Sequence, residues 1–181
     1  MSTYILFAAS ELCCAACSEN FHAPENMIGD NPTKTVVQTT TPVPADCFQP
    51  AADQGTVELL QYEAKDYTQA DRPATHKPAY IYLPYGYDAS KKYDIIYLLH
   101  GWTGTAEQYF GQENLPQMKN LFDNMIARGL TKPFIAVSPT WDKDNRAKDW
   151  GESTREAAVF SSEYINDLIP AVESRYSTYA E

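Results

Sequence analysis

The sequence predicts an α/β fold with a mainly parallel sheet. The first observation is the unbroken apolar run at 95–99, which is too short for a helix, has no helical period and contains β-branched and aromatic side chains. Strands that are buried on both faces, as in a parallel sheet covered by helices, have this composition. The second observation is the order of the predicted elements, which is β-β-β-α-β-α. Strands that alternate with helices favour a mainly parallel sheet with right-handed crossovers.

The first two strands are predicted from local patterns. Apolar residues alternate at 57–62, as they do in a half-buried strand, and 79–83 is a second apolar run. The stretch 66–77 between them is polar and contains Pro73, so we expect a loop there, with His76 at the surface. The third strand is the run described above.

Two helices are predicted from apolar residues at helical spacing. The first is expected between Asn114, which can cap its start, and Gly129, which can end it. Its apolar stripe consists of Met118, Leu121, Phe122, Met125 and Ile126. After a buried strand at 134–137 and a polar loop, a second amphipathic helix is expected over 157–176. Pro170 lies inside it, lacks the N–H for one helical hydrogen bond and should kink the helix.

Length and charge limit the possible functions. The chain has 181 residues, enough for one domain and a tail, and a formal net charge of −10. This acidity argues against nucleic-acid binding, which favours a basic surface, and against docking on anionic lipid. Aromatic residues make up 13% of the chain. Such a content is typical of sugar-binding surfaces but also of ordinary cores, and composition does not separate the two.

The N-terminal part of the chain differs in composition from the rest. Residues 1–17 hold a short apolar run and then small residues before Cys17, a pattern similar to the cleavage box of a bacterial lipoprotein, with Cys17 as the lipidated residue. A plain disordered terminus is the alternative. Residues 18–54 are rich in Pro and Thr and lack an apolar period, so we expect a disordered linker. Residues 55–181 are expected to form the folded domain.

The loop after the run at 95–99 is the strongest candidate for a functional site. The run ends at His100-Gly101, and Gly104 follows. Glycine allows a tight turn and a close approach of the backbone to a ligand. A strand that ends in such a loop places it at the carboxyl edge of the sheet, where open α/β sheets bind ligands. Backbone N–H groups at this edge can point at a developing oxyanion.

Five segments carry a resemblance to a known family. They are Gly55-Thr-Val-Glu58, Tyr80-Ile-Tyr-Leu-Pro-Tyr-Gly-Tyr-Asp88, His100-Gly-Trp-Thr-Gly104, Val137-Ser-Pro-Thr140 and Asp167-Leu-Ile-Pro-Ala-Val-Glu-Ser-Arg-Tyr176. As a set they resemble carbohydrate esterase family 1, the feruloyl and acetyl-xylan esterases, which have an α/β-hydrolase fold. The resemblance implies a truncated α/β-hydrolase that lacks the nucleophile strand and everything after it. The strand at 95–99 would then be an apolar sheet edge that is prone to aggregation.

The resemblance also implies the residues of the site. The N–H donor of the oxyanion hole is expected at Trp102, with Thr103 as the neighbouring candidate. Support of the loop is expected from His100, Gly101 and Gly104. The catalytic Ser, Asp and His are expected beyond Glu181, because in this fold the acid and the His follow the nucleophile strand. No catalytic residue of the triad is therefore assigned within the chain.

Other candidate residues are explained more simply. The nearest match to a nucleophile elbow is Gly151-Glu-Ser153-Thr-Arg155, in which Arg replaces the second glycine and no strand precedes it. We therefore expect Ser153 to cap the last helix. Asp142, Asp144 and Asn145 are similar to the start of a calcium loop, but its Gly and closing Glu are missing. We expect a solvated loop there, and neither a metal nor a cofactor.

Trp141 and Trp150 flank the polar loop at 140–153, on the same sheet edge as His100. They are expected either to bind an aromatic acyl group or a sugar, or to belong to the core. The sequence thus predicts the N-terminal part of a secreted or cell-surface bacterial serine esterase acting on feruloyl or acetyl esters of xylan. The chain alone is expected to be inactive, to bind no nucleic acid, and to meet a membrane only through a lipid anchor. The alternatives are a noncatalytic carbohydrate-binding or scaffold lipoprotein, and another α/β-hydrolase, an acyltransferase or thioester hydrolase.

Overall fold

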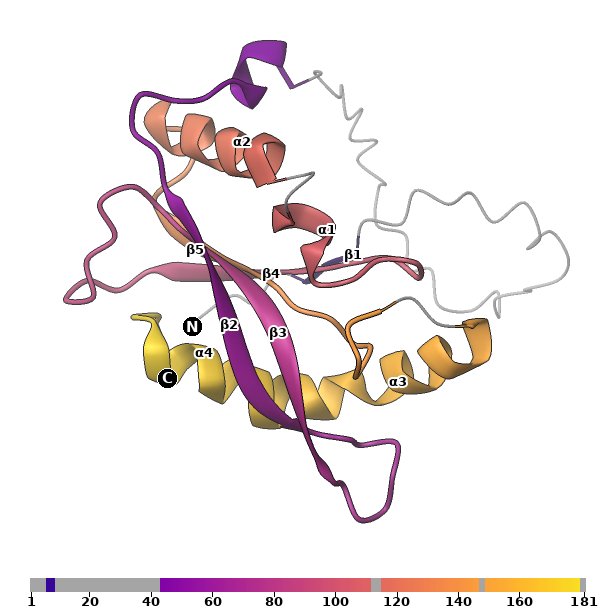
Figure 1. Ribbon diagram of the computed structural model, residues 1–181. Helices are drawn as coiled ribbons and strands as arrows, with labels where there is room; N and C mark the ends of the chain where they lie inside the picture. The colour runs from indigo at the N-terminus through magenta and orange to yellow at the C-terminus, as the bar shows by residue number, and fades with distance from the viewer. Residues whose placement is uncertain (1–5, 9–42, 112–114, 147–148, 180–181) are drawn as a thin grey trace, which may run out of the picture. The chain divides into compact units, whose positions relative to one another are not determined.

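The fold is organised around a five-stranded sheet (Figure 1). The computed structural model describes residues 6–8, 43–111, 115–146 and 149–179. The predicted lipidation site Cys17, most of the predicted linker and the predicted cap Asn114 lie outside these ranges. The strands are β1 Leu6–Ala8, β2 Thr56–Lys65, β3 Ala74–Leu83, β4 Asp94–Leu99 and β5 Phe134–Ser138.

The strands are arranged in the order β1-β4-β5-β3-β2. β1 and β5 are both parallel to β4, whereas β3 is antiparallel to both β5 and β2. The sheet is therefore mixed. From β2 onward the alternation of strands and helices is as predicted, and the antiparallel pairs come from the β2–β3 hairpin at one edge.

The β2–β3 hairpin is longer than the sequence predicts. Its register runs from Thr56 paired with Leu83 to Lys65 paired with Ala74. The predicted loop at 66–77 is therefore wrong for its last four residues, because the backbone hydrogen bonds of a hairpin extend β3 through polar positions. His76 is exposed, as expected, but its neighbour Lys77 is fully buried.

Helices cover both faces of the sheet (Figure 1). α1 Glu107–Phe110 and α2 Leu115–Ala127 lie on one face, and α3 Trp150–Glu163 and α4 Ile169–Arg175 lie on the other. Adjacent strand residues point to opposite faces. The core on the side of α3 and α4 includes Ile81, Tyr97 and Ile135 from the sheet, with Leu168 and Val172 from the helical elements. The core on the side of α1 and α2 includes Tyr82, Leu98 and Phe134 from the sheet, with Phe110 and Phe122 from the helices. None of the helices within the described ranges has the length and apolar content needed to cross a membrane.

The outer side of β4 is occupied, in contrast to the exposed edge that the sequence predicts. Leu6–Ala8 pairs in parallel with Tyr97, Leu98 and Leu99. The prediction of an exposed edge is wrong, because the strand that pairs with β4 precedes it in the chain rather than following β5. A segment from far upstream in the sequence supplies the backbone hydrogen bonds instead.

The folded body also begins before Gly55, where the sequence analysis placed its boundary. The 3₁₀ helix η1 Ala45–Phe48 packs on α2, with Cys47 3% exposed. The side-chain amide of Asn120 donates to the Phe48 carbonyl at 2.9 Å, and that of Asn124 donates to the Cys47 carbonyl at 3.1 Å. Residues 45–48, within the predicted linker, are thus packed on α2, because these amides satisfy backbone carbonyls of a segment that has no strand partner.

The helix ends agree in part with the capping residues predicted from the sequence. α2 ends at Ala127, and the expected glycine follows at Gly129, whose φ of +66° favours glycine and whose N–H donates to the Ile126 carbonyl at 3.0 Å. α3 is capped by Asp149, whose carboxylate accepts from the Glu152 N–H, so the expectation that Ser153 caps it was wrong. The irregularity expected from Pro170 is a π-helical turn at Tyr164–Leu168, directly before α4.

Candidate active site

The candidate site is built on the loop that follows β4. A turn closes it, in which the Gly104 N–H donates to the Gly101 carbonyl at 2.9 Å. Trp102 and Thr103 are the two central residues of this turn and are exposed, and their own N–H groups are not those that close it. A Cβ on Gly104 would lie 2.7 Å from the Cβ of His100, so the loop packs closely on His100 at this point. Trp102, the expected oxyanion donor, and its neighbour Thr103 thus lie at the exposed centre of a closed turn.

His100 packs against the loop from the interior of the protein and is only 2% exposed. Its Nδ1 lies 2.7 Å from the Gly101 carbonyl oxygen, and its Nε2 lies 2.8 Å from Oγ1 of Thr140. A carbonyl only accepts, so we assign the ring proton to Nδ1, and Nε2 accepts from the Thr140 hydroxyl. Burial lowers the pKa of His100, which favours this neutral form. Both ring nitrogens are engaged, and His100 is a structural residue here rather than a free base.

The segment after β5 holds the loop in place. Because β4 and β5 are parallel, their carboxyl ends meet at the same edge of the sheet. Thr140 contacts His100 as described, and its Oγ1 also accepts from the Asp142 N–H at 3.1 Å. Ser138 donates from Oγ to the Ala106 carbonyl at 2.8 Å. Neither hydroxyl group was predicted as a support, although their positions at the end of a buried strand and directly beyond it favour contact with the neighbouring loop.

The tryptophans near this loop divide into two groups. Trp150, at the start of α3, is 64% exposed and lies edge-on against Trp102, which is 44% exposed, with ring centroids 5.1 Å apart. Trp141 is half-buried, stacks on His100 at 3.9 Å and donates from Nε1 to Oγ of Ser153 at 2.9 Å. The structure therefore pairs the predicted substrate residue Trp150 with Trp102, and it places Trp141 among the supports of the loop.

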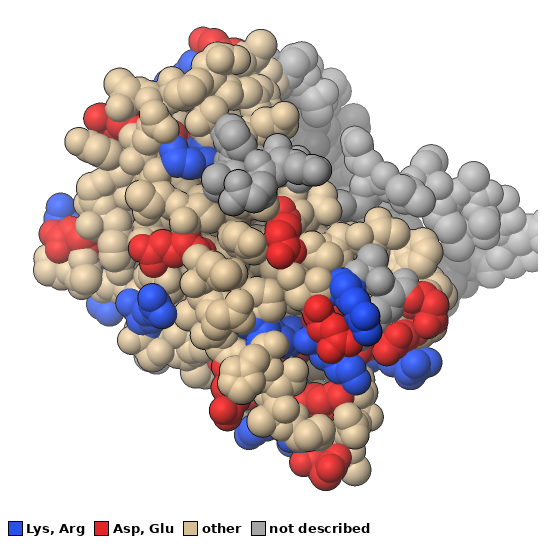
Figure 2. All heavy atoms as spheres, in the orientation of Figure 1, with Lys and Arg blue, Asp and Glu red and all other residues tan. Residues whose placement is uncertain are grey.

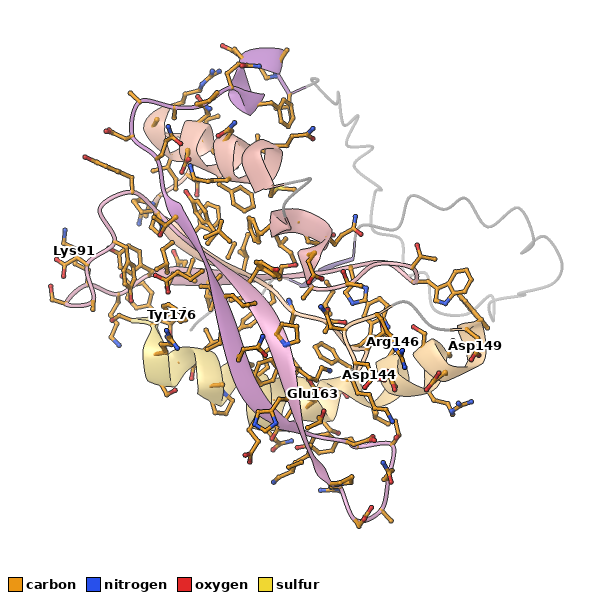
Figure 3. All side chains as sticks on the ribbon, viewed as in Figure 1. Lys91, Asp144, Arg146, Asp149, Glu163 and Tyr176 are labelled. Atoms are coloured by element: carbon orange, nitrogen blue, oxygen red, sulfur yellow. The ribbon has the colours of Figure 1, made fainter. Side chains whose placement is uncertain are left out.

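The remaining candidates within the chain have structural environments. Ser153 is 1% exposed and accepts from Trp141, so its hydroxyl is not presented to a substrate. Among the described residues, His, Cys, Asp and Glu side chains form no group of three that could hold a metal ion. In the loop that resembles a calcium site, Asp144 pairs with Arg146 at 3.4 Å (Figure 3). Asn145 instead donates to Glu107 of α1.

Charged side chains of both signs are mixed on one face of the molecule (Figure 2). On the face drawn in Figure 2, acidic and basic side chains are interspersed and separated by uncharged surface. This face offers no continuous basic surface of the kind that nucleic-acid binding favours.

A family model now identifies the chain. The model described as "Putative esterase" matches residues 71–181, which include the β4 loop and its supports. The chain belongs to this esterase family. Among curated proteins, the chain is 32% identical over 163 residues to endo-1,4-beta-xylanase Y of Acetivibrio thermocellus, a match that covers 90% of this chain and 13% of the relative. It is 33% identical over 110 residues to an endo-1,4-beta-xylanase/feruloyl esterase of Xylanibacter ruminicola, covering 57% of this chain and 14% of the relative.

Solved structures show the same fold. The feruloyl esterase module from Clostridium thermocellum, solved as a serine-to-alanine mutant with sinapinate, is 34% identical with a TM-score of 0.59, and the match covers 78% of this chain and 43% of that one. A ferulic acid esterase from Anaeromyces mucronatus matches with a TM-score of 0.60 at 22% identity, over 75% of this chain and 50% of that one. The predicted resemblance to carbohydrate esterase family 1 and the partial α/β-hydrolase fold are thus confirmed. The chain spans half or less of those structures, and a small part of the curated relatives.

Proposed function

We propose that the chain is the N-terminal part of a secreted serine esterase that hydrolyses feruloyl or acetyl esters of plant cell-wall xylan. The observation that supports the proposal is the turn at 101–104, which has Trp102 and Thr103 at its exposed centre and packs on a buried His100 whose two ring nitrogens are both hydrogen-bonded. A relative named for feruloyl esterase activity is similar to this chain in sequence, and a solved feruloyl esterase module is similar to it in fold. We propose that the Ser, His and Asp of the triad lie outside this chain, and that the chain alone has no turnover.

The proposed chemistry is attack of a serine oxygen on the ester carbonyl. As the new C–O bond forms, the carbonyl oxygen gains negative charge, and the Trp102 N–H donates a hydrogen bond to it. The His of the triad takes the serine proton and gives it to the sugar oxygen as the bond between that oxygen and the acyl carbon breaks, which leaves the acyl-enzyme and the free alcohol. Water then attacks the acyl carbon and releases the acid and the serine. One such amide contributes about 3 to 4 kcal/mol to stabilising the transition state. The loop is suited to this role because its supports hold the amides in place before the charge develops.

The substrate proposal uses the exposed pair Trp102 and Trp150. Two indole rings with centroids 5.1 Å apart, beside the oxyanion amides, offer apolar surface to a planar aromatic acid or to the face of a sugar ring. A noncatalytic carbohydrate-binding protein would use the same surface, so binding alone does not distinguish the two functions. Hydrolysis does.

The test is a glycine substitution in the full-length protein that contains this chain. Gly104→Ala places a methyl group against the His100 side chain and displaces the Trp102 and Thr103 amides. We expect kcat on methyl ferulate or acetylated xylan to fall by about 10²-fold or more, with KM little changed. Gly151→Ala is the matched control, because its methyl group meets only ordinary contacts in the first turn of α3.

Three results would overturn parts of the proposal. An inactive wild-type full-length protein would exclude the esterase function, and binding of xylo-oligosaccharides without hydrolysis would then favour the carbohydrate-binding alternative. A folded Gly104→Ala variant with unchanged kcat would exclude the loop as the oxyanion hole. Enzyme-level hydrolysis of methyl ferulate by the 181-residue chain itself would show that the triad is not outside it.

We also propose that the protein is exported as a bacterial lipoprotein through Cys17. The support is the run of small residues before Cys17 and the Pro- and Thr-rich stretch after it. Metabolic labelling with a radioactive fatty acid should mark the protein, and Cys17→Ser should abolish the label. Labelling that survives Cys17→Ser would contradict the proposed anchor.

A further inference from the structure

The far end of the candidate oxyanion loop is held by a side chain outside the loop. The Ala106 N–H donates to Oδ1 of Asn145 at 2.9 Å, and the Ala106 carbonyl accepts from Ser138 at 2.8 Å. Asn145 also donates from Nδ2 to both carboxylate oxygens of Glu107 at 3.0 Å. One amide group thus bonds two consecutive residues where the loop enters α1. Both Ser138 and Asn145 belong to the segment at the end of β5.

Asn145 has a backbone conformation that few residues adopt easily. Its φ is +49°, in the left-handed region, and its N–H donates to the Asp142 carbonyl at 3.0 Å in a turn. Asn tolerates this region better than most residues with a side chain. Even so, such a backbone conformation persists only when the surrounding structure favours it. The left-handed backbone of Asn145 directs its side chain toward α1, so the contact with Glu107 depends on this backbone conformation.

The charge of Glu107 suits this contact. Partial burial acts to raise the pKa of Glu107, but hydrogen bonds from Thr105 and Asn145 outweigh it and hold the pKa below its ordinary value. Glu107 is therefore an ionised acceptor near neutral pH. A hydrogen bond from an amide to a carboxylate is stronger than one between neutral groups.

Both ends of the loop are therefore fixed to the same segment. At its start, Thr140 holds His100, which bonds the Gly101 carbonyl. At its end, Asn145 holds Ala106 and Glu107. Between these anchors lie the amides of Trp102 and Thr103. A shift of about 1 Å in a positioned catalytic group can cost about 10²-fold in rate, so the anchors matter for catalysis as well as for stability.

We propose that Asn145 is a positioning residue, which holds the Trp102 and Thr103 amides in their oxyanion-binding arrangement by bonding Ala106 and Glu107. Its effect on catalysis rests on the proposed esterase function, whereas its effect on loop order does not. The two effects are measured separately.

The variants distinguish the effect of the Asn145 backbone conformation from the effect of its side-chain hydrogen bonds. Asn145→Gly keeps the left-handed backbone without strain and removes every side-chain contact. Asn145→Asp keeps an acceptor for the Ala106 N–H but sets a carboxylate against Glu107. The double variant Asn145→Asp/Glu107→Gln restores a donor facing an acceptor, with the direction of the hydrogen bond reversed. Arg72→Gly is the matched control, because Arg72 also has a positive φ, of +46°, but lies in the β2–β3 turn.

Amide hydrogen exchange of the segment 101–106 in the full-length protein measures loop order. We expect exchange to be faster by about tenfold or more in Asn145→Gly and Asn145→Asp, close to wild type in the double variant, and unchanged in Arg72→Gly. On methyl ferulate we expect kcat to fall by about tenfold or more in the two single variants, KM to stay within about threefold, and kcat to recover in the double variant.

Each outcome decides a different point. Unchanged exchange of 101–106 in Asn145→Gly would overturn the positioning proposal, whatever the activity. Faster exchange with unchanged kcat would also overturn it, since the loop would then loosen without effect on catalysis. Faster exchange in a protein whose wild type hydrolyses no ester would leave the anchor standing and exclude the esterase function. A double variant that does not recover would limit the anchor to the Ala106 bond and overturn the part assigned to Glu107.

Discussion

Lys77 and Glu163 form a buried ion pair that connects β3 to α3. The Lys77 ammonium lies 2.7 Å from Oε2 of Glu163, with their side chains 0% and 8% exposed. The Tyr62 hydroxyl donates to the other carboxylate oxygen at 2.7 Å, and Lys77 also donates to the Trp141 carbonyl at 3.1 Å. The pair therefore contacts the same Trp141 that stacks on His100. Figure 3 shows Glu163 on α3, beneath the β2–β3 hairpin.

Burial shifts the pKa of both partners toward their neutral forms. It raises the pKa of Glu163, although Lys77 and Tyr62 act against this, and it lowers the pKa of Lys77, although Glu163 acts against that. Removing the ammonium would take away the strongest group that favours ionised Glu163. The pKa of Glu163 in the folded protein would then rise further above its ordinary value of 4.5.

We predict that Lys77→Met lowers the free energy of unfolding by about 3 to 5 kcal/mol at pH 8, because it leaves a buried carboxylate without its partner. The loss should shrink toward pH 4.5. A group whose pKa is raised by folding contributes its stability below the unfolded pKa and loses it as pH rises through the folded pKa. Urea unfolding at a series of pH values measures this.

The control for this prediction is Lys91→Met. Lys91 is 69% exposed and lies 3.9 Å from a half-exposed Asp88, so its loss should cost less than about 0.5 kcal/mol at any pH. A cost for Lys77→Met that does not depend on pH would contradict the buried-carboxylate explanation. It would instead indicate that Lys77 contributes mainly through packing.

At the level of elements, α3 and α4 form one nearly continuous helical rod that is interrupted once. The Ile169 N–H bonds the Tyr164 carbonyl, five residues back, which is a π-type bond. Pro170, the next residue, has no N–H and would clash with the carbonyl four residues earlier in a regular helix. The wider π turn accommodates the ring there. Sequence alone located the disturbance but not its form.

Two glycines end or anchor elements for different reasons. Gly129 has a φ of +66°, and a Cβ there would meet nothing within 4 Å. Gly55 has an ordinary φ, but a Cβ there would meet the Leu83 carbonyl and would lie 2.7 Å from the Tyr82 ring. The Gly55 N–H donates to the buried carboxylate of Asp123 at 2.8 Å, so a shift of this backbone would also weaken that bond.

We predict that Gly129→Ala costs about 1 kcal/mol of stability, which is the conformational cost of a left-handed residue with a side chain. Gly55→Ala should cost more, about 2 to 3 kcal/mol, because overpacking forces the start of β2 away from Asp123. Chemical denaturation of the two variants measures the difference. Equal costs would show that the Gly55 site relaxes easily, and Gly129→Asn should be milder than Gly129→Ala if conformation is the cause.

At the scale of the whole molecule, the sheet depends on a contact distant in sequence. β1 covers the outer side of β4 at Tyr97, Leu98 and Leu99, where unpaired N–H and C=O groups would otherwise be open to other chains. β1 lies in the segment 1–17, for which the sequence predicts an export signal. Removal of this segment on export would free the edge of β4 for another strand. In one molecule the segment therefore cannot be a cleaved signal and also cover β4.

We predict that deletion of residues 1–8 converts the 181-residue chain into oligomers or aggregates at concentrations at which the intact chain is smaller. Phe7→Pro should act in the same direction, because proline removes a backbone donor from the strand, whereas Phe7→Val keeps it. Gel filtration with light scattering measures the size of each. If the deletion variant stays as small as the intact chain and melts at the same temperature, then β1 does not protect the edge of β4.

The candidate site could be predicted only in part. The glycines of the β4 loop and the run that precedes them indicated where the site lies, and the resemblance named Trp102 and His100. Asn145 and Thr140 were not found as supports, since nothing local in the sequence shows which residue of one loop contacts another loop. Lys77 was expected in a loop, because charged residues are rarely buried without a paired charge and the sequence does not show that Glu163 is its partner.

The sequence by itself determined the strands, the helices and their order, because hydrophobic periodicity and glycine positions act within a few residues. It also determined the family, through motifs that hold together over most of the domain. Only the tertiary structure decided the partner of β4, the pairing of Trp102 with Trp150, the buried contact of Lys77 with Glu163 and the anchor at Asn145. Each joins segments separated by tens of residues, and such contacts depend on how the chain packs in space rather than on any local pattern.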